Sequence, residues 1–471
     1  MAGKRTNSHL AGELLVELRR DDAVPLHRQI EASIRAGIRS GRLPLGSSLP
    51  PTRAIAADLG VSRGVIVEAY QQLVAEGYLT SRPGGYTQVA IGPESAPEPA
   101  RPAPKRVLPI DFGYGRADVS SFPRAAWLRS IRRVLTEAPN ERFGYLSGRG
   151  APELHEAIAD YLNRVRGTSA DPGDIVICNG YAQGVALLIQ VLARSGARRL
   201  AVEDPSADDD ARVVAVAAGL EVVGVPVDRD GVRVDALDRT DADALVLTPS
   251  HQWPTGGVLS AESRAAVLRW AADRGALVIE DDYDAEYRYD RAPIGAMQGL
   301  APDRVVYAGT ASKTLAPGLR LAWLVVPRRL VDDVVAAKIT ADRGSPVIDQ
   351  LTFADFLARG EFDRHLRRMR PVYRRRRDAL LESLRDRTPD LEPAGIAAGL
   401  HLVAWLPDDL SEAAVVEAAA RRGLGVYGVG PYRMSGGGPG GLIFGYSTLS
   451  ERTITEGIGV LAEVIDEVRS G

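Results

Sequence analysis

Cysteine, lysine and long apolar runs are all scarce in this chain of 471 residues. Its only cysteine, Cys178, has no partner for a disulfide within the chain, which suits a reducing cytoplasm. No apolar run reaches the ~18 residues that a membrane span needs, and the N-terminus lacks the basic-then-apolar pattern of a secretory signal. The six histidines are scattered without the spacing of a metal site. These absences argue against a disulfide-stabilised secreted protein and a membrane protein, and we expect a cytoplasmic location.

Lysine is the rarest charged residue, with four lysines against 54 arginines. One of them, Lys313, lies in residues 310–320, between apolar runs at 304–309 and 319–326. This pattern predicts a loop between two buried strands. Arginine cannot lose its proton or form an imine, whereas a partly desolvated lysine amine can do both. Lys313 is therefore a candidate for chemistry, and the alternative is a loop lysine that only caps a strand.

The charge balance differs between the two ends of the chain, although its composition is that of an ordinary globular protein. Residues 1–90 hold 11 basic and 8 acidic residues, a net charge of +3. The remainder holds 47 basic and 53 acidic residues, a net charge of −6. A basic front part suggests an anionic partner, but a balance of +3 is a weak indication without a motif.

The front of the chain is predicted to hold three helices and a β-hairpin. Gly60 ends the second helix with a tight turn, and Ser62 is a good N-cap for the third. Helix, turn, capped helix and hairpin occur here in the order of a winged helix-turn-helix. The alternative is a small helical interaction module with a solvated basic face. The expected elements are helices over residues 25–40, 51–59 and 63–76 and a hairpin over 78–89.

These residues resemble the GntR family of winged helix-turn-helix regulators over about residues 22–90. The resemblance is carried by LPPTRAIAADLGVSRGVIVEAYQQLVAEGYL and SRPGGY. It implies that the helix after Ser62 enters the major groove of double-stranded operator DNA and that the wing approaches the minor groove. Arginine can read guanine or simply neutralise phosphate, and the sequence does not choose between these. The residues implied near bases or phosphates are Arg53, Ser62, Arg63 and Gly64, with Arg82 and Gly84 in the wing.

Residues 91–107 are predicted to be a linker. They include five prolines and almost no large apolar side chain, so they cannot bury a core. We therefore expect three parts: a DNA-binding domain in residues 1–90, the linker, and a second domain in residues 108–471.

The second domain alternates helices with short apolar strands, which favours an α/β fold around a mainly parallel sheet. Its last portion, about residues 345–471, is predicted to form a smaller α+β lobe. Sheets of this kind bind ligands beyond the carboxyl ends of their strands. The strand candidates are residues 175–178, 199–203, 221–225, 244–248, 276–280, 305–308 and 322–326.

Three polar motifs fall at predicted strand ends. Residues 179–183 open a helix, whose free N–H groups suit a phosphate, although many such turns look alike. Residues 280–286 supply carboxylates. A carboxylate beside the pyridine nitrogen of a bound cofactor would keep that nitrogen protonated. The alternative is an acidic strand end in solvent. Residues 248–256 offer polar groups for a ring hydroxyl, or they form only a structural Pro-Gly turn.

Together these motifs resemble the aminotransferase-like domain of the MocR subfamily of GntR regulators, a fold-type-I domain that binds pyridoxal 5′-phosphate (PLP). The matching strings are TPSHQWPTG, EDDYDAEYRY and GTASKTLAPGLRLAWLVVP, in the order and at the spacing of that subfamily. The resemblance implies that Lys313 carries PLP as a Schiff base, that Asp281 pairs with its pyridine nitrogen and that Tyr283 lies at its ring hydroxyl. The phosphate is then assigned to Thr310, Ser312, Arg320 and the turn at Tyr181 and Ala182.

Two departures from the pattern bear on the ligand. Many relatives place Pro-Gly-Tyr after the second strand, with the tyrosine near the cofactor ring, but this chain has Pro205, Ser206 and Ala207. True aminotransferases usually carry an arginine before the last strand to clamp the substrate carboxylate, and residues 442–446 have none. Arg433 is a possible substitute, although a solvated loop arginine is the simpler interpretation.

We therefore expect a PLP-dependent transcriptional regulator rather than an enzyme, with residual transaminase activity left open. The second domain would sense PLP or a PLP–amine adduct, and the two departures favour PLP itself, as in regulators of vitamin B6 metabolism. The resemblance implies a head-to-tail homodimer in which each DNA-binding domain packs on the other subunit, with paired DNA half-sites. The alternatives are an active aminotransferase with a fused DNA-binding domain, and a degenerate body that serves only dimerisation.

Overall fold

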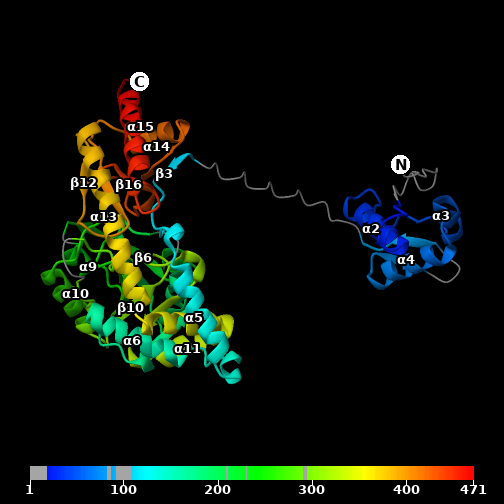
Figure 1. Cartoon of the computed structure of the whole chain (residues 1–471), viewed down its shortest axis with the longest axis horizontal. Helices are drawn as coiled ribbons and strands as arrows, with labels where there is room; N and C mark the ends of the chain where they lie inside the picture. The colour runs from blue at the N-terminus through cyan, green and yellow to red at the C-terminus, as the bar shows by residue number, and fades with distance from the viewer. Residues whose placement is uncertain are drawn as a thin grey trace. The chain divides into compact units, whose positions relative to one another are not determined.

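The computed structural model describes residues 18–81, 86–91, 108–207, 211–229, 231–289 and 294–470. The chain separates into two compact units, one within residues 1–105 and the other within 106–471 (Figure 1). Of the helices in the described ranges, none combines the length and the apolar character that a bilayer crossing requires.

The described part of the N-terminal unit has three helices and a two-stranded antiparallel sheet: α2 (Leu26–Arg39), α3 (Thr52–Leu59), α4 (Arg63–Ala75), β1 (Leu79–Ser81) and β2 (Thr87–Val89). Gly60 ends α3 with a φ of +60°, a left-handed conformation that favours glycine. Ser62 occupies the N-cap position of α4 in an extended conformation, but its side chain makes no capping hydrogen bond. The predicted helices and hairpin strands are confirmed. The apolar side chains of these elements pack together in one hydrophobic core.

A mixed sheet of eight strands forms the centre of the described C-terminal unit, in the order β4-β11-β10-β9-β8-β5-β6-β7. The strands β10, β9, β8, β5 and β6 run parallel, while β11 and β7 pair antiparallel with their neighbours. The seven predicted strands are confirmed. Their bounds are β4 (Ile175–Cys178), β5 (Arg199–Asp204), β6 (Glu221–Asp228), β7 (Gly231–Val232), β8 (Ala244–Leu247), β9 (Leu277–Asp282), β10 (Val305–Thr310) and β11 (Ala322–Val325).

Helices cover both faces of this sheet, because successive strand residues point to opposite sides. Val176 and Leu324 belong to one buried cluster, and their neighbours Ile177 and Trp323 belong to another. Buried on both faces, the central strands are apolar almost throughout rather than alternating. The helices around the sheet are α5 (Arg124–Glu137), α6 (Pro152–Arg166), α7 (Tyr181–Arg194), α8 (Ala211–Ala217), α9 (Val234–Leu237), α10 (Ala261–Arg274), α11 (Val331–Asp342) and α12 (Val347–Ala358).

A smaller lobe follows, as predicted, and the long helix α13 (Glu361–Arg387) packs against both α12 and α15 (Glu451–Ser470). Its four-stranded sheet has the order β12-β13-β16-β15. One contribution was not predicted: β3 (Ile110–Asp111), at the start of the unit, pairs in parallel with β14 (Leu424–Gly425). The other elements of the lobe are β12 (Glu392–Ala394), β13 (His401–Trp405), β15 (Tyr427–Gly428), β16 (Gly441–Gly445), α14 (Glu412–Arg421) and α15 (Glu451–Ser470).

The N-terminal core generates a stability prediction. Ile34 is 0% exposed between the helices, so Ile34→Ala is expected to lower the free energy of unfolding of this unit by about 2–5 kcal/mol. Val74, 37% exposed on α4, is the matched control, and Val74→Ala should change the free energy of unfolding by less than about 0.5 kcal/mol. Calorimetry of the full chain would check this. Equal shifts in both variants would contradict the assignment of Ile34 to a stabilising core.

Candidate functional site

A cavity of about 710 Å³ lies where the parallel strands of the large sheet reach their carboxyl ends. Its wall is drawn from the ends of β5, β8, β9 and β10, the start of α7 and the loops beside them. Segments distant in sequence therefore meet here. All eight residues that the resemblance assigned to PLP are in the wall: Lys313, Asp281, Tyr283, Thr310, Ser312, Arg320, Tyr181 and Ala182.

Lys313 occupies the loop between β10 and the antiparallel β11, as the sequence predicted. Its Nζ donates a hydrogen bond of 2.6 Å to the carbonyl oxygen of Gly115. A Cβ added to Gly115, where φ is +67°, would lie 3.2 Å from this amine. A glycine at position 115 therefore lets the backbone come close to the lysine. The alternative of a strand cap does not explain why the amine faces a cavity.

Asp281 reaches the cavity because side chains alternate along β9. Its neighbours Glu280 and Asp282 are buried: Glu280 accepts hydrogen bonds from the N–H groups of Met297 and Gln298, and Asp282 binds Arg166. Burial, together with nearby Asp282, raises the pKa of Glu280 to about 7. The acidic strand end is thus largely buried, and the alternative of an acidic strand end in solvent does not fit the structure.

The turn before α7 and the loop after β10 converge on one side of the cavity. A Cβ at Gly180, where φ is +92°, would meet the guanidinium of Arg320, so a side chain there would require the arginine to move. Arg320 Nη2 donates a hydrogen bond of 2.7 Å to the carbonyl oxygen of Asn179. Ser312 N–H and Thr310 Oγ1 are 3.1 Å apart, and the two hydroxyls are 3.0 Å apart. Hydroxyls, a guanidinium and the positive end of α7 form an anion-binding arrangement.

A network of polar side chains around a buried lysine, which the sequence did not reveal, holds this turn. Lys338 is 0% exposed, and its Nζ lies 2.7 Å from Asp342 Oδ2. The same oxygen accepts hydrogen bonds from the side-chain amides of Asn179 at 2.8 Å and Gln183 at 2.7 Å. Gln183 and Lys338 are 155 positions apart in the sequence, so sequence spacing gave no signal.

The motif at residues 248–256 also reaches the cavity. Thr248 and Trp253 lie in the wall, together with the unpredicted Glu203. Burial raises the pKa of Glu203 to about 7, although Thr248 donates to it through both its N–H at 2.9 Å and its hydroxyl at 2.7 Å. Burial and nearby carboxylates also raise the pKa of Tyr283 well above its ordinary value, so this phenol keeps its proton.

Aromatic side chains form a further part of the wall, which the sequence analysis missed. Tyr114 and Tyr432 hydrogen-bond through their hydroxyls, and the rings of Trp253 and Tyr432 meet edge to face with centroids 4.6 Å apart. Only Trp253 stood in a recognised motif. Ala207 lies in the wall too, so this position presents only a methyl group to the cavity.

Arg433 is not part of the described wall. Its guanidinium donates 2.7 Å to the carbonyl oxygen of Pro439 in its own glycine-rich loop. The interpretation of Arg433 as an ordinary loop arginine fits this geometry. The remaining arginine in the described wall besides Arg320 is Arg116, whose side chain is 64% exposed and 3.8 Å from Asp111.

The predicted DNA-contacting residues lie on the surface of the N-terminal unit. Arg53 is exposed on α3, and Ser62, Arg63 and Gly64 are exposed at the N-terminus of α4. A helix N-terminus with an arginine beside it suits a phosphate group. The wing predictions, Arg82 and Gly84, lie outside the described residues.

Comparisons with known proteins agree with both units. The family "Aminotransferase class I and II" matches residues 110–431, and "Bacterial regulatory proteins, gntR family" matches residues 26–89. The probable rhizopine catabolism regulatory protein MocR of Rhizobium meliloti is 34% identical and covers 95% of each chain. The pyridoxine biosynthesis regulator PdxR of Corynebacterium glutamicum is 33% identical over 98% of this chain and 100% of its own.

A solved structure gives the same result for the larger unit. LysN, an α-aminoadipate aminotransferase of Thermus thermophilus crystallised with N-(5′-phosphopyridoxyl)-L-leucine, superposes with a TM-score of 0.69. It is 26% identical and covers 78% of this chain and 94% of its own. The predicted fold is confirmed. The chain belongs to the MocR subfamily of the GntR transcriptional regulators, in which a helix-turn-helix DNA-binding domain is joined to a fold-type-I aminotransferase domain.

Proposed function

We propose that this regulator binds PLP in the cavity of the large unit and that PLP, or a PLP–amine adduct, controls its binding to operator DNA. One observation carries the proposal: an amine, a carboxylate and an anion-binding arrangement converge in one cavity from separate segments of the chain. Homology to a fold-type-I domain supports it, and so does the phosphopyridoxyl ligand of LysN.

The residues fit the chemical groups of PLP. Lys313 supplies an amine for the aldehyde, and Asp281 supplies a carboxylate for the pyridine nitrogen. Arg320, with the hydroxyls and the helix end beside it, supplies a site for the phosphate. The close approach of the backbone at Gly180 to Arg320 and at Gly115 to Lys313 supports this assignment. When bound, PLP would supply an aldehyde that condenses with amines and an electron-poor ring attached to it.

We infer a sensor rather than an aminotransferase. A carboxylate substrate needs a cationic clamp, and Arg433 lies outside the described wall. Arg116 is exposed and close to Asp111, so solvent and the neighbouring carboxylate weaken its pull on a ligand. These features favour PLP itself as the effector. The similarity to PdxR is consistent with a role in vitamin B6 metabolism, although MocR, named for rhizopine catabolism, is equally similar.

A homodimer is also part of the proposal. Helix α5 and the segment after it expose large apolar side chains, which is unusual for a monomer surface. Leu128 and Leu135 are 56% and 55% exposed, Phe143 is 41% exposed and Tyr145 is 97% exposed. We propose that a second copy of the chain covers this face in the head-to-tail arrangement of the subfamily.

The test of the sensor uses the DNA upstream of the gene. We expect PLP, titrated into stripped full-length protein, to change the affinity or the footprint on this DNA. Lys313→Ala and Lys313→Arg should both lose this response and the visible absorbance of bound PLP, because neither side chain can form an imine. Arg433→Ala is the control and should behave as wild type. Sustained transamination of amino donors by the wild type would contradict the sensor role.

Arg63 is expected to contribute directly to DNA binding. Arg63→Ala should weaken binding by about 1–3 kcal/mol, because a base or phosphate contact is lost, and leave PLP absorbance unchanged. Arg63→Lys separates the two contacts, since lysine keeps the phosphate interaction but loses bidentate recognition of guanine. The exposed Arg42→Ala is the matched control. Gel shifts at several salt concentrations measure these effects. Unchanged affinity in Arg63→Ala would contradict this role.

The dimer face gives a separate expectation. Leu135→Asp puts a charge into the proposed apolar interface and should shift the chain from dimer to monomer in sedimentation experiments. Val213→Asp is a control of similar exposure, 60% against 55%, on α8. A wild-type monomer, or an undisturbed dimer in Leu135→Asp, would rule out this face.

A further inference from the structure

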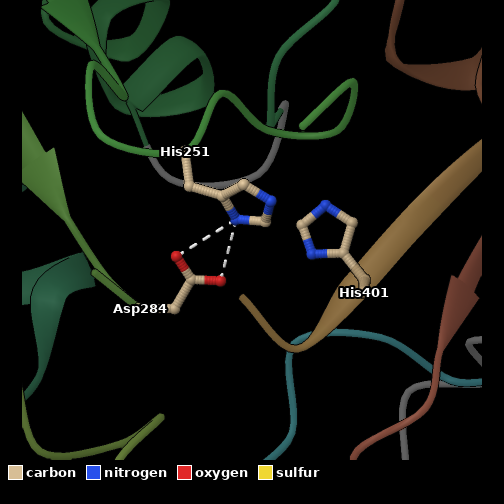
Figure 2. Close-up of side chains that lie close together, drawn as sticks. All are labelled: His251, Asp284 and His401. Carbon is tan, nitrogen blue, oxygen red and sulfur yellow. Dashed lines mark hydrogen bonds and ion pairs between the residues drawn. The ribbon is translucent and has the colours of Figure 1, made fainter. Parts of the chain in front are cut away.

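A buried cluster of polar side chains lies next to the cavity. His251, Asp284 and His401 are 3%, 1% and 2% exposed. They come from three segments: the loop after β8, the loop after β9 and the start of β13. Figure 2 shows His251 facing the carboxylate of Asp284, with the ring of His401 beside it. Their potential ligand atoms lie within 4.8 Å of one another, so a metal ion is the first interpretation to examine.

The hydrogen bonds favour a different interpretation. His251 Nδ1 lies 3.0 and 3.2 Å from the two oxygens of Asp284 (Figure 2). His401 Nε2 is 3.1 Å from the carbonyl oxygen of Pro254, which can only accept, so this nitrogen carries the proton. Burial and the nearby His251 lower the pKa of His401 to about 3, so its ring is neutral. A metal bound through His251 Nδ1 would have to displace the Asp284 contact that the structure already makes.

The cluster connects to the cavity through Tyr283. The Tyr283 hydroxyl donates 3.0 Å to the carbonyl oxygen of His251, and its oxygen lies 3.1 Å from His251 Nδ1. An N–H at Nδ1 therefore faces both the Asp284 carboxylate and the phenolic oxygen. Asp284, His251 and Tyr283 form a continuous chain of polar contacts that ends in the cavity wall.

We propose that His251 and Asp284 are positioning residues that hold the Tyr283 hydroxyl at the cavity wall and thereby set the proton affinity of bound PLP. This inference rests on the proposed function, in which PLP occupies the cavity and Tyr283 lies at its ring hydroxyl. It assigns a role to the histidine of the TPSHQWPTG motif, which has no place in the cavity wall itself.

The physical reason is the direction of the hydrogen bonds. Tyr283 keeps its proton, and with PLP bound that proton would turn from the carbonyl oxygen of His251 to an anionic ring oxygen. Donation from His251 Nδ1–H to the phenolic oxygen strengthens that donation, since linked hydrogen bonds polarise one another. A hydrogen bond donated to the ring oxygen lowers the pKa of the bound chromophore. The other titratable groups around Tyr283 and the cluster are Asp281, Glu203, Tyr446, His401 and Lys313.

The test is a pH titration of the visible absorbance of the PLP-loaded full chain. His251→Asn and Tyr283→Phe should each raise the apparent pKa of the bound chromophore by about one unit, the scale of one lost hydrogen bond to a charged group. The double variant should shift no further than Tyr283→Phe alone, because His251 acts through Tyr283. Asp284→Asn should shift the pKa in the same direction, and it carries the test if His251→Asn fails to fold.

His401→Gln is the matched control, because its amide can still donate to Pro254 and position 401 makes no hydrogen bond to Tyr283. We expect it to leave the chromophore pKa close to that of the wild type. Additive shifts in the double variant would overturn the inference. So would a stoichiometric metal in the wild type that both His251→Asn and His401→Gln remove. A wild-type chain that binds no PLP would instead contradict the proposed function.

Discussion

The geometry of the cavity depends on a buried ion pair beneath it. Arg166, at the end of α6, is 0% exposed and binds Asp282 through Nε at 2.8 Å and Nη2 at 2.7 Å. It also donates to Ser250 and to the carbonyl oxygen of Ile294, so it joins four segments of the chain. Removing one partner of such a pair leaves an uncompensated buried charge. Because Arg166 holds the side chain of Asp282 on one face of β9, the next side chain, that of Asp281, points to the opposite face and into the cavity.

Other residues of the cavity wall are also held in place by specific contacts. The turn before α7 is held by Lys338 and Asp342, which lie outside the cavity wall, and by Arg320, which lies in it. Tyr283 is fixed by His251, and Lys313 is drawn toward Gly115. The wall is thus held both by contacts among its own residues and by neighbours outside it, such as Lys338 and His251. This arrangement suits a domain whose ligand contacts have to be reproducible, whether it performs chemistry or reports on a bound ligand.

The two units divide the tasks of a regulator. The N-terminal unit presents a helix with an exposed arginine at its N-terminus, and the larger unit presents a cavity at the strand ends of an aminotransferase-like fold. Ala207 lies in the cavity wall, and Arg433 lies outside the described wall.

The sequence by itself determined the elements and pointed to the residues that line the cavity. Apolar runs, the glycine after α3 and the motifs around Lys313 and Asp281 are local signals, since each depends on a few consecutive residues. Only the tertiary structure decided which side chains support them. Lys338 with Gln183, Tyr114 with Tyr432, and His251 with Asp284 and His401 lie far apart in sequence, and no spacing rule joins them. They meet because strands and loops converge at one edge of the sheet, and that convergence is a property of the packed chain.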